Sequence, residues 1–290
     1  MGIAAHYYTH RTFWINHPDA FNVQAAPVPI DAVQGQMRAP LTLDEARASI
    51  VLAALSGGKY DIGDDLPTLG SEPERLALVT NRNLLQMAKL GHASKPLDFM
   101  TYRPEDEQPS IFLLHEDERQ SMLAVFNWTE QPRSHAFTFA ALDLPSGHAY
   151  HLYDALNEDQ PLALNGETIR LENQSAHSVK LIKIIDESKP AAAPAITAQA
   201  PASAKAREDV VFSVKAAEDG VPALAYHWDF GDGITADGSS QNHTFTLAGT
   251  YKVRLVAEGV DGIPAEKTFS IIVDGLQEIG PPRRYIEPMN

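Results

Sequence analysis

Residues 41–67 read LTLDEARASIVLAALSGGKYDIGDDLP, a succession that predicts a helix, a short strand and an acidic loop. Thr42 and Glu45 have the T-x-x-E spacing of a capping box, in which each side chain satisfies a backbone N–H group at the start of a helix. Apolar residues then recur at helical spacing until Gly57-Gly58, where a helix is expected to end. This stretch therefore predicts a helix that begins next to Thr42 and stops at the glycine pair.

The acidic loop contains Asp64 and Asp65 and follows the strand candidate Lys59-Tyr60-Asp61-Ile62. Beyond the loop, Ser71 and Glu74 form a second capping-box pair, which predicts a helix through roughly Met87 with an end at Gly91. Helix, strand, loop and helix form the repeating unit of an α/β barrel, whose working residues lie just past the C-terminal ends of strands. We therefore expect Asp64 and Asp65 to bind substrate hydroxyls or to cap the following helix.

The composition limits the classes of partner. The chain has 290 residues, 44% of them hydrophobic, which suffices for two or three domains with their own cores. Its formal net charge is −15, and because no segment is basic, nucleic acid is not expected as a partner. No apolar run approaches the roughly 20 residues that cross a bilayer, so no membrane partner is expected. The chain has no cysteine, which excludes disulfides and thiolate chemistry. No cofactor is expected.

A second informative stretch is Trp14-Ile15-Asn16-His17-Pro18-Asp19. Pro18 disfavours a helical conformation at the preceding residue, so the segment is expected to form an extended turn. It gathers an aromatic face, an amide, an imidazole and a carboxylate within six positions. Sugars are bound by such a set, because an aromatic ring covers their C–H face while polar groups pair with their hydroxyls. A purely structural turn is the alternative interpretation.

Two groups of side chains could suggest a metal. His6 and His10 would share a helix face, but a third zinc ligand is not evident, and packing with hydrogen bonding is expected instead. Asp229, Asp232 and Asp237 could suggest Ca²⁺, but their spacing lacks the ligand count of a known calcium loop. No metal site is therefore expected in this chain.

The two N-terminal stretches together resemble the end of a glycoside hydrolase barrel of the α-galactosidase (melibiase) type. The resemblance covers residues 7–91 and is carried by WINHPD (14–19), LTLDEARAS (41–49), ALSGGKYDIGDDLP (54–67) and ERLALV (74–79). Within the family's usual W-x-N-D-P-D motif, His17 replaces the first aspartate, and Asp19 matches the carboxylate of the sugar pocket. The resemblance implies that the substrate-binding residues are Trp14, Asn16, His17, Asp19, Asp64 and Asp65.

Catalytic residues are expected to be absent. The family hydrolyses glycosides with retention, using two carboxylates, and both come from barrel strands upstream of the W-x-N-D-P-D turn. Thirteen residues precede Trp14 here, and adjacent residues such as Asp64 and Asp65 cannot flank a glycosidic bond from opposite faces. We therefore expect a C-terminal fragment of a larger enzyme, or a truncated product, that lacks the nucleophile and the acid/base. Whether this chain is an enzyme stays open.

Residues 96–187 predict an antiparallel β-sandwich, because short alternating runs are separated by turns. Asn165-Gly166 is a tight-turn pair, and AVFNWTE (124–130) resembles the opening of the β-domain in the same hydrolase family. Core packing is favoured for Trp128 over a sugar-binding platform. The expected strands are 110–115, 121–128, 136–139, 150–154, 168–171 and 178–185.

Residues 188–194 form a Pro/Ala linker, and residues 195–274 resemble a PKD domain, a small immunoglobulin-like sandwich. The resemblance is carried by WDFGDG (228–233) and HTFTLAGTYKVRL (243–255). Trp228 and Phe230 are expected to face the core, Gly231 and Gly233 to adopt positive φ, and Asp232 to accept backbone hydrogen bonds in the turn. Residues 275–290 are expected to be a flexible tail.

The predicted fold is mixed and mostly β: a partial (β/α) barrel over residues 1–95, an antiparallel β-sandwich over 96–187, and the PKD sandwich. The predicted function is that of a C-terminal fragment of an α-galactosidase-like glycoside hydrolase, inactive alone, with a carbohydrate as its partner. The alternative is a non-catalytic carbohydrate-binding or surface-interaction protein. An extracellular or periplasmic location is expected for the parent protein, although residues 1–5 do not resemble a signal peptide. The oligomeric state is left open.

Overall fold

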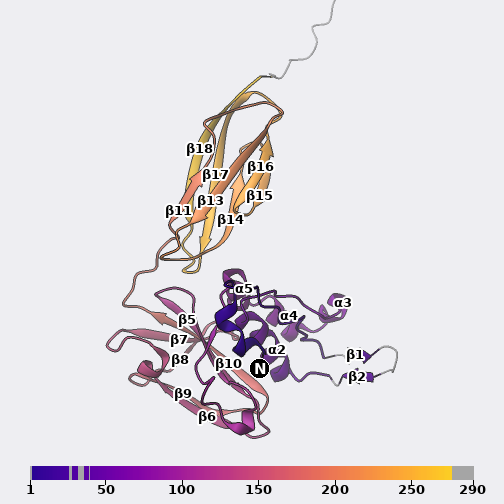
Figure 1. Cartoon of the computed structure of the whole chain (residues 1–290), viewed down its shortest axis with the longest axis vertical. Coiled ribbons are helices and arrows are strands. Elements are labelled where there is room, and N and C mark those ends of the chain that lie inside the picture. The colour runs from indigo at the N-terminus through magenta and orange to yellow at the C-terminus, as the bar shows by residue number, and fades with distance from the viewer. Residues whose placement is uncertain (1, 26–27, 32–35, 39, 276–290) are drawn as a thin grey trace, which may run out of the picture. The chain divides into compact units, whose positions relative to one another are not determined.

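The computed structural model of the chain describes residues 2–25, 28–31, 36–38 and 40–275. The chain divides into two compact units, residues 1–191 and 192–290 (Figure 1). Both are mostly β, as predicted, and their sheets are antiparallel apart from one parallel strand pair in the second unit. No helix in the described part of the chain has the length and apolar character needed to cross a bilayer. The flexible tail predicted at 275–290 lies outside the described residues from 276 onward.

The first unit is built on a six-stranded sheet with the order β3-β4-β5-β10-β7-β8. A second layer is formed by the pair β6–β9, and β1 pairs with β2. The strands are β1 (Val28–Asp31), β2 (Gln36–Arg38), β3 (Lys95–Pro96), β4 (Ile111–His115), β5 (Gln120–Asn127), β6 (Arg133–Thr138), β7 (Tyr150–Asp154), β8 (Gln160–Leu162), β9 (Thr168–Gln174) and β10 (Ser178–Asp186).

Strand β5 is buried along its whole length, because both faces of the sheet are covered. Leu123 and Val125 point into a core that also contains Phe137 of β6 and Ile169 of β9. Successive side chains of a strand alternate between faces, so Met122, Ala124 and Phe126 point to the opposite face, which helix α2 covers through its contacts with β10. The sheet therefore lies between a helical layer and a second β-layer.

The helices of this unit are short except for α2, which begins at the predicted capping box. Thr42 Oγ1 accepts a hydrogen bond from the Glu45 backbone N–H, and the Glu45 carboxylate accepts one from the Thr42 N–H. The helices are α1 (Gly2–Ala5), η1 (Tyr7–Thr9), α2 (Leu43–Leu55), α3 (Leu66–Leu69), α4 (Pro73–Val79), α5 (Arg82–Leu90), η2 (Pro104–Asp106) and η3 (Phe139–Leu142). Helices α2 to α5 lie beside the sheet in Figure 1.

Two local predictions are wrong. Residues 59–62 form no strand. Ile62 makes an isolated parallel bridge to Phe21, in which the Phe21 N–H donates to the Asp61 carbonyl and the Gly63 N–H donates to the Phe21 carbonyl. The helix predicted from Ser71 to Met87 is two helices, since Asn81 caps a new helix by accepting a hydrogen bond from the Leu84 N–H. Ser71 is not its cap either: its hydroxyl donates to the Thr68 carbonyl and Glu72 precedes α4.

The predicted β-strands beyond residue 96 are confirmed, with shifts of a few residues at their ends. Asn165 bridges to Thr168 around Gly166, whose φ of 63° is the positive value that the tight turn requires. Gly91 also ends α5 in the left-handed conformation, as predicted. The antiparallel prediction for this region is therefore correct, whereas the boundary between a barrel portion and a sandwich at residue 95 stays a prediction.

The second unit is a sandwich of a three-stranded sheet, β11-β13-β16, and a five-stranded sheet, β12-β18-β17-β14-β15. Strand β12 pairs parallel to β18, which closes one edge. The strands are β11 (Ile196–Gln199), β12 (Ser203–Lys205), β13 (Asp209–Ala216), β14 (Ala223–Asp229), β15 (Thr235–Asp237), β16 (Ser240–Thr244), β17 (Gly249–Gly259) and β18 (Ala265–Asp274).

Trp228 and Phe230 lie in the core between these sheets, as predicted, each with 1% of its surface exposed. The turn that follows also has its predicted geometry. Gly231 and Gly233 have φ of 78° and 90°, and Asp232 Oδ1 accepts a hydrogen bond from the Ile234 N–H. The turn thus depends on glycine conformational freedom and on two carboxylates, because Asp229 Oδ1 also accepts from the Gly231 N–H.

The first prediction concerns the Trp228 core site. In residues 192–275 expressed alone, Trp228→Ala should lower the free energy of unfolding by about 3–5 kcal/mol, because a small sandwich cannot collapse onto the empty site. Urea denaturation followed by circular dichroism measures the change. Val211→Ala is the matched control, since Val211 lies on the neighbouring sheet but is 61% exposed. Equal stability of the Trp228→Ala variant and the parent would contradict the core assignment.

The second prediction concerns His227, on the outer face of the same sandwich. Its pKa is raised by the hydrogen bond to Asp237, despite an opposing effect of burial, and by Glu258. A raised folded-state pKa means that the stabilisation is present below the unfolded value and is lost as the pH rises through the folded value.

His227→Gln should therefore lower the free energy of unfolding at pH 5.5, by less than about 1 kcal/mol because the pair is partly exposed. At pH 9 the variant and the parent should be equally stable. A difference that grew with pH would show that the imidazole is stabilising in its neutral form.

Candidate functional site

The turn at residues 14–19 is fixed by a very close approach of two backbone segments. A Cβ atom on Gly58 would lie 1.7 Å from the carbonyl oxygen of Asn16, so only glycine fits at this position. The Lys59 N–H donates to that same carbonyl oxygen. The Asn16 side chain is buried and donates from Nδ2 to the Ser56 carbonyl, at 3.0 Å. The C-terminal end of α2 therefore holds the turn in place.

His10 ties the turn to the end of α5. Its Nδ1 accepts a hydrogen bond from the Asn16 N–H at 3.1 Å, and its Nε2 lies 3.0 Å from the Gly91 carbonyl. Because one ring nitrogen must accept and the other must donate, this arrangement selects the neutral tautomer with hydrogen on Nε2. The expectation that His10 serves packing and hydrogen bonding is confirmed.

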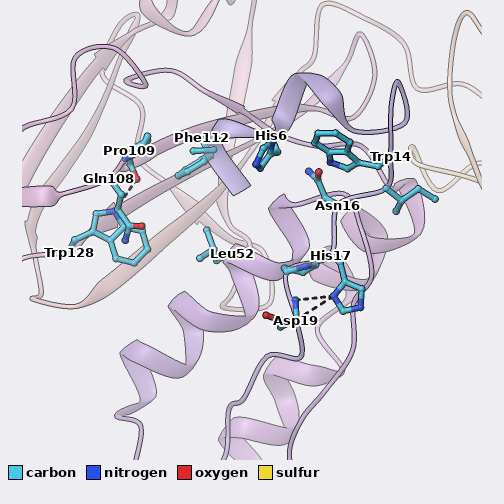
Figure 2. Close-up of a pocket in the computed structure, with 13 residues that line it drawn as sticks. His6, Trp14, Asn16, His17, Asp19, Leu52, Gln108, Pro109, Phe112 and Trp128 are labelled. Carbon is cyan, nitrogen blue, oxygen red and sulfur yellow. Dashed lines mark hydrogen bonds and ion pairs between the residues drawn. The ribbon is translucent and has the colours of Figure 1, made fainter. Parts of the chain in front are cut away.

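Residues of the turn line a cavity of about 520 Å³ (Figure 2), a size typical of small-molecule sites. Trp14 is 50% exposed and meets the His6 ring edge-on, with ring centroids 5.4 Å apart. The Asp19 side chain is 96% exposed, and the Asp19 N–H donates to His17 Nδ1. Asp19 has a φ of 61°, a left-handed conformation that is uncommon for residues other than glycine.

Four of the six predicted binding residues meet at this cavity: Trp14, Asn16, His17 and Asp19. Asn16 lines it while its side-chain amide donates to the Ser56 carbonyl. In Figure 2, His17 and Asp19 lie next to each other, and Trp14 lies above Asn16.

Asp64 and Asp65 do not line the cavity. Asp64 accepts hydrogen bonds from the Asn22 side chain and from the Val23 and Gln24 backbone N–H groups, so its carboxylate organises the chain after the turn. Asp65 caps α3 by accepting from the Thr68 N–H. For Asp65, the predicted alternative of helix capping is confirmed.

Sequence reasoning missed the opposite wall of the cavity, which comes from distant segments. Leu52 reaches it from α2, Phe112 from β4, and Gln108, Pro109 and Trp128 from the loops beside β4 and β5. Trp14 and Trp128 lie on opposite sides of Leu52 in Figure 2. The alternating pattern near residue 128 predicted the end of a strand. It did not predict which residues the Trp128 indole would contact.

The lining of the cavity combines aromatic faces with polar side chains. Aromatic faces stand at both ends, and imidazole, amide and carboxylate groups lie between them. Among the described residues that line it, Asp19 is the sole carboxylate, whereas hydrolysis by the usual mechanisms needs two. The set can pair with hydroxyl groups while covering an apolar C–H face.

Among the described residues, no group of three or more His, Asp or Glu side chains is arranged to hold a metal ion. The three aspartates weighed for calcium instead have partners in the protein. Asp229 accepts from the Gly231 N–H, Asp232 also lies 2.9 Å from His243 Nε2, and Asp237 lies 2.7 Å from His227 Nδ1.

Comparison with known proteins identifies the second unit. A family model described as the PKD domain matches residues 191–273, which confirms the predicted resemblance there. The PKD1 domain of the Vibrio cholerae metalloprotease PrtV is 24% identical, with a TM-score of 0.26, and the match covers 29% of this chain and 100% of that domain.

Two sugar-cleaving enzymes are similar to the chain in structure. α-Galactosidase I from Mortierella vinacea is 16% identical with a TM-score of 0.42, and the match covers 50% of this chain and 36% of that enzyme. A GH27 β-L-arabinopyranosidase variant from Geobacillus stearothermophilus, solved with arabinose, is 19% identical with a TM-score of 0.46, over 62% of this chain and 40% of that enzyme. The chain thus spans well under half the length of either enzyme, and the similarity concerns the fold.

The third prediction tests the close approach at Gly58. Gly58→Ala should lower the free energy of unfolding of the first unit by about 3 kcal/mol, because the new methyl group forces the Asn16 backbone away. Differential scanning calorimetry of the full chain measures this change. Gly70→Ala is the matched control: Gly70 has a helical φ of −58°, and its Cβ would meet no atom closer than 3.3 Å. Equal effects of the two substitutions would show that the approach is not constraining.

Proposed function

We propose that residues 1–191 are the C-terminal portion of an α-galactosidase-like glycoside hydrolase and that the cavity at residues 14–19 binds a carbohydrate. Within this portion, residues 1–95 correspond to the last units of the barrel and residues 96–187 to the β-sandwich. The observation that carries the proposal is the convergence of Trp14, Asn16, His17 and Asp19 on one cavity. These are residues that the W-x-N-H-P-D motif singles out.

The chemistry of the cavity supports a neutral sugar as the ligand. The exposed Trp14 ring offers a flat apolar surface, which suits the C–H face of a pyranose. The exposed Asp19 carboxylate can accept hydrogen bonds from two adjacent hydroxyls, and the His17 ring lies beside it. A galactoside is the sugar that the motif resemblance favours.

The PKD domain at residues 191–273 serves in this proposal as an accessory module, a spacer or adhesive element rather than a catalytic one. Its exposed surface carries isolated apolar side chains such as Val211 and Ile234. An extracellular or periplasmic location of the parent protein fits an enzyme that meets polymeric sugars outside the cell.

The second candidate function is that of a non-catalytic carbohydrate-binding or surface-interaction protein. It is favoured by the presence of one carboxylate, Asp19, among the described lining residues of the cavity. The two candidates differ in turnover and not in binding. We therefore expect this chain to bind an α-galactoside without hydrolysing it, and release of p-nitrophenol from its p-nitrophenyl α-galactoside would contradict that expectation.

The fourth prediction tests sugar binding directly. Methyl α-galactoside should bind the full chain, and Trp14→Ala should weaken its affinity about tenfold or more, because the stacking surface is lost. Isothermal titration calorimetry gives the dissociation constants. Tyr8→Ala is the matched control, since Tyr8 is a similarly exposed aromatic residue, at 66%, that does not line the cavity. Unchanged affinity in the Trp14→Ala variant would overturn the assignment of this cavity.

A further inference from the structure

A second cavity of about 1030 Å³ lies next to the first and shares two lining residues with it, Gln108 and Trp128. Its walls come from two loops of the first unit. Residues 103–108 surround η2, and residues 128–133 connect β5 to β6. The two cavities therefore adjoin at Gln108 and Trp128.

Trp128 is held rigidly between the two cavities. Its Nε1 donates to the Pro109 carbonyl at 3.0 Å, and its indole stacks on Phe126, with ring centroids 4.4 Å apart and an interplanar angle of 8°. Phe126 is fully buried, so the indole rests on a fixed support. A half-buried aromatic ring in this position gives an apolar wall to both cavities at little cost in side-chain freedom.

The second cavity carries groups that pair with hydroxyls. Arg103 and Glu107 are exposed, with a planar donor group and an acceptor respectively. The Arg133 guanidinium does not offer its donors to a ligand in the same way. It is bonded to the buried Asp106 carboxylate at 2.5 Å and lies 3.4 Å from Glu105. Arg133 instead fixes the loop at 103–108 against the start of β6.

The charge of the second cavity excludes acidic ligands. Its lining contains four acidic residues, Glu105, Asp106, Glu107 and Glu130, and two basic ones, Arg103 and Arg133. Four negative and two positive charges give the lining a formal charge of −2. Arg133 already forms ion pairs with two of the carboxylates, Glu105 and Asp106. A sugar with carboxylate groups would be repelled at this site, whereas a neutral sugar would not.

We propose that the two cavities form one binding groove for a neutral oligosaccharide, with sugar units on both sides of Trp128. This inference rests on the proposed function, because it extends the same site from a single sugar to a chain. Arg103 and Glu107 are the specificity-determining residues of the far part of the groove. They act on the units beyond Trp128 and have no contact with a sugar that occupies the first cavity alone.

The test compares galactose, α-1,4-galactotriose and α-1,4-trigalacturonic acid as ligands of the full chain by isothermal titration calorimetry. Galactotriose and trigalacturonic acid share their linkage and differ in replacing each hydroxymethyl group by a carboxylate. Galactotriose should bind about tenfold more tightly than galactose, as expected for one or two added hydrogen bonds. Trigalacturonic acid should bind no more tightly than galactose.

Variants separate the two proposals. Arg103→Ala and Glu107→Gln should each remove most of the advantage of galactotriose and leave the affinity for galactose unchanged. Trp14→Ala should weaken both ligands. Equal affinity for galactose and galactotriose, or an advantage that survives both Arg103→Ala and Glu107→Gln, would overturn the extended groove while leaving the single-sugar site intact. Binding of neither sugar would overturn both proposals.

Discussion

The contact between Gly58 and the Asn16 carbonyl is the constraint on which the candidate site depends. A helix end and a turn lie closer here than any side chain allows. The same small region also holds Gly57, whose missing side chain leaves room for the His92–Ala93 backbone, and Ser94, which donates to the Leu55 carbonyl. The backbone segments at residues 16, 57–58 and 92–94 therefore meet at the end of α2, where close contacts and hydrogen bonds fix their positions.

This arrangement gives the site its geometry. Helix α2 is fixed at its start by the capping box and at its end by these backbone contacts, and one of its faces covers the sheet beside β10. Leu52, near the end of the helix, is thereby brought to the wall of the cavity between Trp14 and Trp128. The position of this cavity-lining residue of α2 is thus set by packing against a strand more than a hundred residues away in sequence.

Features that depend on hydrogen bonds within one turn could be predicted from the sequence, whereas features that depend on tertiary contacts could not. The capping box at Thr42 and Glu45 satisfies itself within one turn, so its outcome does not depend on the fold. The pair Ser71 and Glu74 has the same spacing, but the Thr68 carbonyl takes the Ser71 hydroxyl, and α4 starts one residue after Glu72. Residues 59–62 had strand-like composition, but their pairing with the segment at Phe21 is limited to one bridge, and no local pattern predicts that limit.

The same distinction applies to the site. Trp14, Asn16, His17 and Asp19 are close in sequence, and their convergence on a cavity follows from one turn. Asp64 looked equally suited to a ligand, yet its Oδ2 accepts from the backbone N–H groups of residues 23 and 24, and its Oδ1 accepts from the Asn22 side chain. A carboxylate in an irregular segment can bind a ligand or accept hydrogen bonds from the protein backbone. Which of the two it does depends on whether backbone N–H groups without another partner lie within hydrogen-bond distance.

The two tryptophans of the β-regions show why the wall at residue 128 could not be predicted. Each belongs to an aromatic pair two residues apart on one strand face, and the two rings of each pair are nearly parallel, at 8° for Phe126–Trp128 and 4° for Trp228–Phe230.

Trp228 is enclosed because a second sheet brings Phe212 against it, so both members of its pair are buried. Trp128 follows the last residue of β5, where the ladder with β10 has ended, so its ring lies at the rim. Similar aromatic pairs thus give a core tryptophan in one sandwich and a cavity wall in the other, because Trp228 lies within β14 whereas Trp128 lies beyond the end of β5.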